Sequence, residues 1–309
     1  MFTEQQQLDI VRTALDGVFY QNFEYGQNPG TATAETAELF KPRHTEHQAY
    51  IEEIFKGVSL YQNTGETQTV GVSIPKVANK LIVPVQDWTQ SIPLSKNLFD
   101  DNLHGVWAKS VADMALKARR TMDFQSMGIF RGAFSTTLTA DGSALCGTHT
   151  LLNGQVINNS VGALLLNFDN FTTAVVALQQ QPDHAGVILG SVPAILLVPP
   201  ALFTTATQLT QSVLQPFGGD NSMNVYRSPY DLVVYTSPYL GAAAGGYDTY
   251  WFLLGRNHSI TRLIRQGIET YLRHWGESND RTYYYQANYR EAYFASDYVG
   301  VVGSTGNGS

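Results

Sequence analysis

One short loop holds the residues of this sequence that are best suited to covalent chemistry. Cys146 and His149 stand close together, and Asp141 precedes them in the same loop. A thiol needs a neighbouring base to act as a nucleophile, and the base needs a third group that orients it. Such groups normally meet from distant parts of a fold. We therefore expect a buried cysteine and a structural histidine here, and we keep a cysteine hydrolase as a rival hypothesis.

A metal site is the second chemistry that the residue types permit. His44 and His47 flank Glu46, but no second pair or matching carboxylate follows, and zinc requires three or four ligands. Asp141 and Ser143 resemble the start of a calcium loop, but the required glycine and closing glutamate are absent from their places. Phosphate-binding glycine loops and the G-x-S-x-G elbow are also missing. The sequence predicts no catalytic, cofactor-binding or metal-ligating residue, no cofactor and no enzyme activity.

The composition favours a protein whose surface is largely covered by partners. The chain has 309 residues, of which 43% are hydrophobic and only 15% are charged. About a quarter of residues are charged in an ordinary soluble domain. The 17 tyrosines and 15 phenylalanines suit interface cores, and they suit a β-rich protein equally well. The net charge of −7 is unlike that of a protein that coats DNA, so we expect any nucleic acid to be enclosed and not gripped.

Several other classes are disfavoured by simple counts. Cys146 is the single cysteine, which excludes an internal disulfide. The N-terminal residues lack the basic and apolar regions of a signal peptide. The apolar run at residues 192–203 is interrupted by prolines and is too short to cross a bilayer. We therefore expect a protein made in a reducing cytosol, without membrane contact.

The elements that would position these residues mix helical and strand patterns. Apolar residues recur with helical spacing, which predicts helices over residues 3–20, 45–56, 100–130, 168–181 and 200–214. The third would be roughly 40 Å long. Alternating residues predict a projecting hairpin within 57–99, and apolar runs predict buried strands at 193–198, 231–237 and 249–255.

The C-terminal part permits two interpretations. Residues 259–272 fit a helix by spacing, whereas residues 281–294, RTYYYQANYREAYF, are typical of a strand. The segment GESND between them predicts a turn. A long hairpin explains both halves, so we predict strands for both.

The order of these parts resembles that of the major capsid proteins of tailed phages, including Mu-type head subunits, which share the Hong Kong 97-like fold. The resemblance is strongest from about residue 94 to residue 300. It is carried by the phrases IPLSKNLFDDNLHGVWAKSVADMALKARRTMD, DGSALCGTHTLLNGQVINNS, AILLVPPALFTTATQLTQS, YDLVVYTSPYL, TYWFLLG and ASDYVGVVGSTG.

The resemblance implies an α+β fold with four parts. These are an N-terminal arm at residues 1–56, an extended loop hairpin at 57–99, a peripheral domain with a long spine helix at 100–140 and 250–309, and an axial domain at 141–249. The glycine-rich stretches PFGGDNS and GAAAGGYD would be tips of the axial domain. The extended loop would lie over the spine of a neighbouring subunit.

The function implied by the resemblance is self-assembly. Subunits would form hexamers and pentamers of an icosahedral shell that encloses double-stranded DNA in the virion, after assembly in the bacterial cytoplasm. A portal, a separate scaffolding protein and a decoration protein would be partners. An encapsulin-like nanocompartment shell and a tail component are rival hypotheses. Lys76 and Lys80 lie in the extended-loop region, but no partner asparagine or assisting glutamate can be matched, so no crosslink is inferred.

Overall fold

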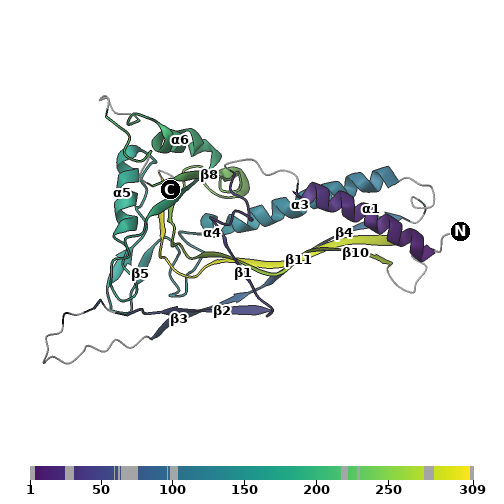
Figure 1. Cartoon of the computed structure of the whole chain (residues 1–309), viewed down its shortest axis with the longest axis horizontal. Coiled ribbons are helices and arrows are strands. Elements are labelled where there is room, and N and C mark those ends of the chain that lie inside the picture. The colour runs from purple at the N-terminus through teal and green to yellow at the C-terminus, as the bar shows by residue number, and fades with distance from the viewer. Residues whose placement is uncertain are drawn as a thin grey trace.

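A long sheet and a compact sheet form the two ends of an elongated molecule (Figure 1). The computed structural model describes residues 4–24, 31–58, 60–61, 63, 76–95, 97, 104–216, 222–227, 230–274 and 282–306. Helices and strands alternate irregularly along the chain, as in the α+β class. No helix among these residues is long and apolar enough to cross a membrane.

The long sheet confirms the predicted C-terminal hairpin. Its strand order is β1 (Lys41–His44), β10 (Ile260–His274), β11 (Thr282–Ala295) and β4 (Gln86–Ser95). β11 pairs antiparallel with both β10 and β4, and β1 runs parallel to β10. Side chains of β11 alternate between buried and half-buried along most of its length, because successive residues of a strand point to opposite faces.

Two helices cover one face of the long sheet (Figure 1). They are α1 (Glu4–Glu24) and α3 (His104–Ser126), and the short helix α4 (Gly128–Arg131) follows α3. The predicted helices at 3–20 and 100–130 are thus confirmed. Their buried side chains, with those of the sheet, form one core that includes Phe19, Trp107, Met114 and Tyr285. Asp16 fixes α1 to the sheet, since it accepts 2.7 Å hydrogen bonds from the hydroxyls of Tyr285 and Thr270.

The compact sheet takes its strands from two of the expected parts of the chain. Its order is β12 (Val301–Ser304), β9 (Trp251–Gly255), β7 (Pro193–Val198) and β8 (Val233–Thr236). We expected all of 250–309 to lie with the long hairpin, but β9 and β12 pair in this other sheet. The physical reason is the sequence WFLLG of β9, which is buried at every position because its alternate side chains pack in two different core clusters on the two faces of the compact sheet.

Helices and short elements complete the compact end. The predicted helices at 168–181 and 200–214 are present as α5 (Phe168–Gln179), η1 (Pro200–Leu202) and α6 (Phe203–Gln211), which pack on the sheet. Asn167 caps α5 by accepting a hydrogen bond from the backbone N–H of Asn170. Further elements are β5 (Thr148–Thr150), β6 (Val156–Asn158) and η2 (Ala242–Ala244). The expected loop tip at residues 217–221 lies outside the described residues.

A second hairpin projects along the other face of the long sheet. It consists of β2 (Ala49–Phe55) and β3 (Val77–Pro84), which pair antiparallel. The helix predicted over 45–56 is wrong, because the apolar residues there also fit an alternating strand and β3 supplies the partner. The expected hairpin within 57–99 also differs from the structure, since its later residues form β4 in the long sheet.

Candidate assembly surfaces

The loop with Cys146 does not form a nucleophile–base pair. Cys146 is buried in the apolar core, and burial raises the pKa of its thiol. His149 Nδ1 lies 2.8 Å from a carboxylate oxygen of Asp141, and no hydrogen bond joins it to Cys146 in the described part of the chain. A protonated, enclosed thiol cannot attack a substrate. The structure therefore places the cysteine as a core residue and the histidine as a partner of Asp141.

His149 belongs to a buried cluster of aromatic rings that joins β5 to two loops. Its ring lies 4.8 Å from that of Tyr298, and the ring of His184 lies 5.4 Å from Tyr298. His184 Nε2 is 2.9 Å from Asp297 Oδ2, and this hydrogen bond raises the pKa of His184. The hydrogen bonds from His149, Thr139 and Ser143 hold the pKa of Asp141 well below its usual range, against the opposing effect of burial. These contacts stabilise this part of the fold.

The histidines near β1 do not gather ligands. His44 ends β1 and His47 lies in the turn that follows, and both side chains are exposed. Within the residues that the structure describes, no group of three or more His, Cys, Asp or Glu could hold a metal ion. Pairing with β10 places His44 on the edge strand of the long sheet.

The outer face of the β2–β3 hairpin carries large apolar side chains that are exposed in the described part of the subunit. Ile51 stands opposite Ile82, and Phe55 stands opposite Val77. Ile51 is 56% exposed and Ile82 is 66% exposed. Between the two apolar pairs, Lys80 Nζ lies 2.7 Å from Glu53 Oε1. We call this set of residues 51, 53, 55, 77, 80 and 82 the apolar ridge.

The inner face of the same hairpin packs on the body of the protein. Tyr50, Leu81 and Val83 contact a core cluster that includes Leu263 and Phe294 of the long sheet. The alternation of the strand therefore places one set of side chains in the core and the other set in solvent. Because the inner face fixes the orientation of the hairpin, the apolar ridge is presented outward.

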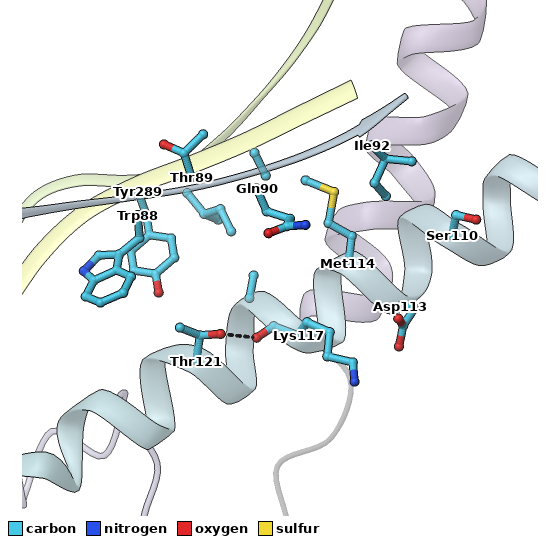
Figure 2. A pocket seen from close by; sticks show the side chains of 13 residues that line it. Trp88, Thr89, Gln90, Ile92, Ser110, Asp113, Met114, Lys117, Thr121 and Tyr289 are labelled. Carbon is cyan, nitrogen blue, oxygen red and sulfur yellow. Dashed lines mark hydrogen bonds between the residues drawn. The ribbon is translucent and has the colours of Figure 1, made fainter. Parts of the chain in front are cut away.

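A groove between α3 and β4 is the second surface that could receive another chain. Its cavity is about 550 Å³, and Figure 2 shows the side chains that surround it. Met114 of α3 and Trp88 of β4 give it apolar walls, while Lys117 and Asp113 lie on the helix side. The hydroxyl of Tyr289 is buried, makes no hydrogen bond of standard geometry and faces the cavity in Figure 2. A ligand or chain with polar groups could satisfy it.

The sequence did not reveal either surface. The ridge was hidden because residues 45–56 were predicted to be helical, which would scatter Ile51, Glu53 and Phe55 around an axis. The segment AYIEEIF does carry a signal, since every second residue shares a face in a strand. The groove joins segments that are distant in sequence, so only the pairing of β4 with β11 brings Trp88 beside Tyr289.

A long helix on an extended sheet, a compact second sheet and a projecting hairpin match the Hong Kong 97-like fold of phage capsid proteins. The family model described as phage capsid protein matches residues 78–304, so the chain belongs to that family. It is a capsid shell protein of a virion. No curated protein matches the sequence.

Solved capsids share this fold at low sequence identity. The chain is similar to the capsid of an empty GTA particle, with a TM-score of 0.58, 12% identity, and coverage of 92% of this chain and 94% of that one. It is similar to the mature capsid of bacteriophage PhiM1, with a TM-score of 0.58, 11% identity, and coverage of 91% and 88%. For a virus-like particle from Pyrococcus furiosus the values are 0.50, 9%, 94% and 98%. These identities establish the fold alone.

Proposed function

We propose that this chain is a major head subunit that assembles as hexamers and pentamers into an icosahedral shell around double-stranded DNA. The observation that carries the proposal is the apolar ridge, which is held outward by its own strand pairing and whose apolar side chains are exposed in the part of the subunit that the structure describes. Burying an exposed isoleucine side chain stabilises an interface by about 1.5–3 kcal/mol. A neighbouring subunit is the partner that would be available at every copy of the ridge.

The groove between α3 and β4 is the complementary surface on that neighbour. Its apolar walls suit the isoleucines of the ridge, and its polar rim suits the ion pair between Glu53 and Lys80. Obligate interfaces bury about 2,000–5,000 Å² in total. The ridge supplies only part of such an area, so the arm and the axial tips would supply the rest, and the shell would be held by many moderate contacts.

The functional layout follows the order of the chain. We assign the arm to residues 1–56, the extended loop to 57–99, the peripheral domain to 100–140 and 250–309, and the axial domain to 141–249. Two adjustments are supported by the sheets. The β2 strand of the arm segment belongs with the projecting hairpin. The strands β9 and β12 belong to the compact sheet, which we assign to the axial domain.

We also infer that the chain performs no catalysis and that assembly takes place in the bacterial cytoplasm. The first inference is supported by the enclosed Cys146 thiol, whose pKa is raised by burial. A portal, a separate scaffolding protein and a decoration protein are expected partners of such a shell.

Electron microscopy of the purified protein tests the proposal. The wild-type chain should form closed icosahedral shells, and the double variant Ile51→Asp, Ile82→Asp should remain as dispersed subunits, because two carboxylates would be buried without partners. Ile188→Asp is the matched control, since that isoleucine is equally exposed but lies outside the ridge. Open rings or tubes from the wild-type chain would contradict the proposal. Shells that protect protein cargo but no DNA from digestion would favour a nanocompartment.

A further inference from the structure

One acid and one base stand on the helix wall of the groove between α3 and β4. Asp113 and Lys117 both line the cavity, both are exposed, and they lie one helical turn apart (Figure 2). They are the only charged side chains among the residues that line it. Neither forms an ion pair with another residue of the described part of the chain. Both charges are therefore available to a chain that enters the groove.

The neighbouring charges of α3 have different surroundings. Lys109 is exposed one turn before Asp113, but it does not line the groove. Arg119 is buried and contacts Glu35 at 3.0 Å. The pattern of charge that the groove presents is therefore set by Asp113 and Lys117.

The apolar ridge carries one acid and one base at a similar spacing. Glu53 and Lys80 stand directly opposite each other on β2 and β3, and their side chains are 38% and 60% exposed. Directly opposite residues of two strands have Cβ atoms about 4.5–5.5 Å apart. Residues one turn apart on a helix have Cβ atoms about 5–6 Å apart. The pair on the ridge therefore matches the pair on the groove in spacing.

We propose that the ridge of one subunit seats on the groove of a second copy with Glu53 against Lys117 and Lys80 against Asp113, an inference that rests on the proposed function. Each charge then has an opposite charge beside it on its own subunit and another on the neighbour. If the hairpin were turned by half a turn, Glu53 would meet Asp113 and Lys80 would meet Lys117. Both contacts would then be repulsive. The charges therefore select one of the two seatings.

The apolar side chains of the ridge do not make this selection. The pairs Ile51–Ile82 and Phe55–Val77 flank the ion pair, and on β2 they are two residues away on either side, which is about 7 Å. An apolar pair therefore lies over the groove in either seating. Because the inner face of the hairpin packs on its own subunit, the seating of the ridge also determines the orientation of the whole neighbour.

Exchange of the charges within each pair tests the inference, with light scattering to measure the protein concentration at which shells form. The ridge exchange is Glu53→Lys, Lys80→Glu, and the groove exchange is Asp113→Lys, Lys117→Asp. Each exchange keeps the net charge and leaves opposite charges side by side within the subunit. Either exchange alone should raise the concentration needed for assembly about tenfold or more, because like charges meet at the interface. The variant with both exchanges should assemble at nearly the wild-type concentration.

Lys109 supplies a matched control for Lys117. Both lysines are exposed and lie one turn from Asp113, but only Lys117 lines the groove. Lys117→Gln should raise the assembly concentration about fivefold, whereas Lys109→Gln should leave it unchanged. An equal rise in the two variants would make net charge the cause and would contradict the inference. Urea denaturation of the unassembled variants should give nearly the wild-type midpoint, which excludes a loss of folding.

Two further results would overturn the inference. One is assembly of both exchange variants at the wild-type concentration, which would show that the four charges do not meet. The other is a combined variant that assembles no better than either exchange alone, which would show that the two pairs act separately. Both results require that the wild-type chain forms shells, so they defeat the inference alone. A wild-type chain that forms no shells would instead defeat the proposed function.

Discussion

The two long hairpins of this protein share one architecture and differ in what covers them. In the β10–β11 hairpin, the side chains of Tyr283, Tyr285 and Tyr289 are buried beneath α1 and α3. In the β2–β3 hairpin, Ile51 and Ile82 stand equally well paired across the strands but remain in solvent. Strand pairing alone therefore does not determine burial. A layer of helices covers one hairpin, whereas no described element of the subunit covers the outer face of the other.

The largest expected effect is the truncation of a tyrosine in the enclosed hairpin. Tyr285→Ala should lower the free energy of unfolding of the subunit by about 3–5 kcal/mol, because it removes a fully buried ring from the core. Urea denaturation of unassembled protein measures this. Ile82→Ala in the exposed hairpin should change the same quantity by no more than about 0.5 kcal/mol. Equal losses in the two variants would show that the hairpins do not differ as described.

Removing only the hydroxyl of the same tyrosine should have a smaller effect. Tyr285→Phe keeps the ring but deletes the 2.7 Å hydrogen bond to Asp16. A hydrogen bond to a charged group contributes about 1.5–3 kcal/mol, and Asp16 retains its bond from Thr270. Urea denaturation should therefore place this variant between the wild type and Tyr285→Ala. A loss of stability as large as that of the alanine variant would mean that the hydrogen bond holding α1 to the sheet contributes more than the packing of the ring.

A histidine–aspartate pair just beyond the end of β11 should make the stability of the fold depend on pH. The hydrogen bond to Asp297 raises the pKa of His184 above its ordinary value of 6.5. Protonated His184 therefore stabilises the fold fully below pH 6.5, and this contribution is lost as pH rises through the higher pKa of the folded state. The urea midpoint of the wild type should decline over that range.

His184→Gln is the matching variant, because glutamine keeps a donor but does not titrate. Its urea midpoint should be flatter with pH over the range in which the wild type declines. Identical pH profiles for the two proteins would show that the pair of His184 and Asp297 makes no contribution through protonation.

The smallest expected effect concerns the ion pair of the exposed hairpin. Glu53→Gln removes the partner of Lys80, and both side chains are largely in solvent, so the subunit should lose only about 0.2–1 kcal/mol. High salt should shrink the difference further. A loss comparable to that of Tyr285→Phe would indicate that the hairpin is covered even in the free subunit.

The sequence predicted those parts of the fold that depend on local patterns. Pro199 and Pro200 mark the break between β7 and the following helix, and helical spacing identified α1, α3 and α5. The failures occurred where a distant partner decides the outcome. The residues of β2 fit a helix until β3 pairs with them, and β9 required two neighbours that are remote in the chain.

The candidate surfaces were less predictable than the fold. The low charge and abundant aromatics indicated hidden contacts without locating them. The apolar ridge depends on the register of Ile51 with Ile82, and the groove depends on the pairing that brings Trp88 beside Tyr289. Cys146 and His149 are close in sequence, but no hydrogen bond joins their side chains, because the cysteine faces the core.

The placement of the β2–β3 hairpin and of α3 on opposite faces of one sheet has a consequence for curvature. Each subunit therefore has two different faces before it contacts another subunit. A neighbour whose groove beside α3 receives the apolar ridge must overlap the hairpin side of the first subunit with its own helix side, and this fixed order allows neighbouring subunits to tilt in only one sense. The direction in which a shell of such subunits curves is then determined by the fold of one subunit. The number of subunits determines only the size of the shell.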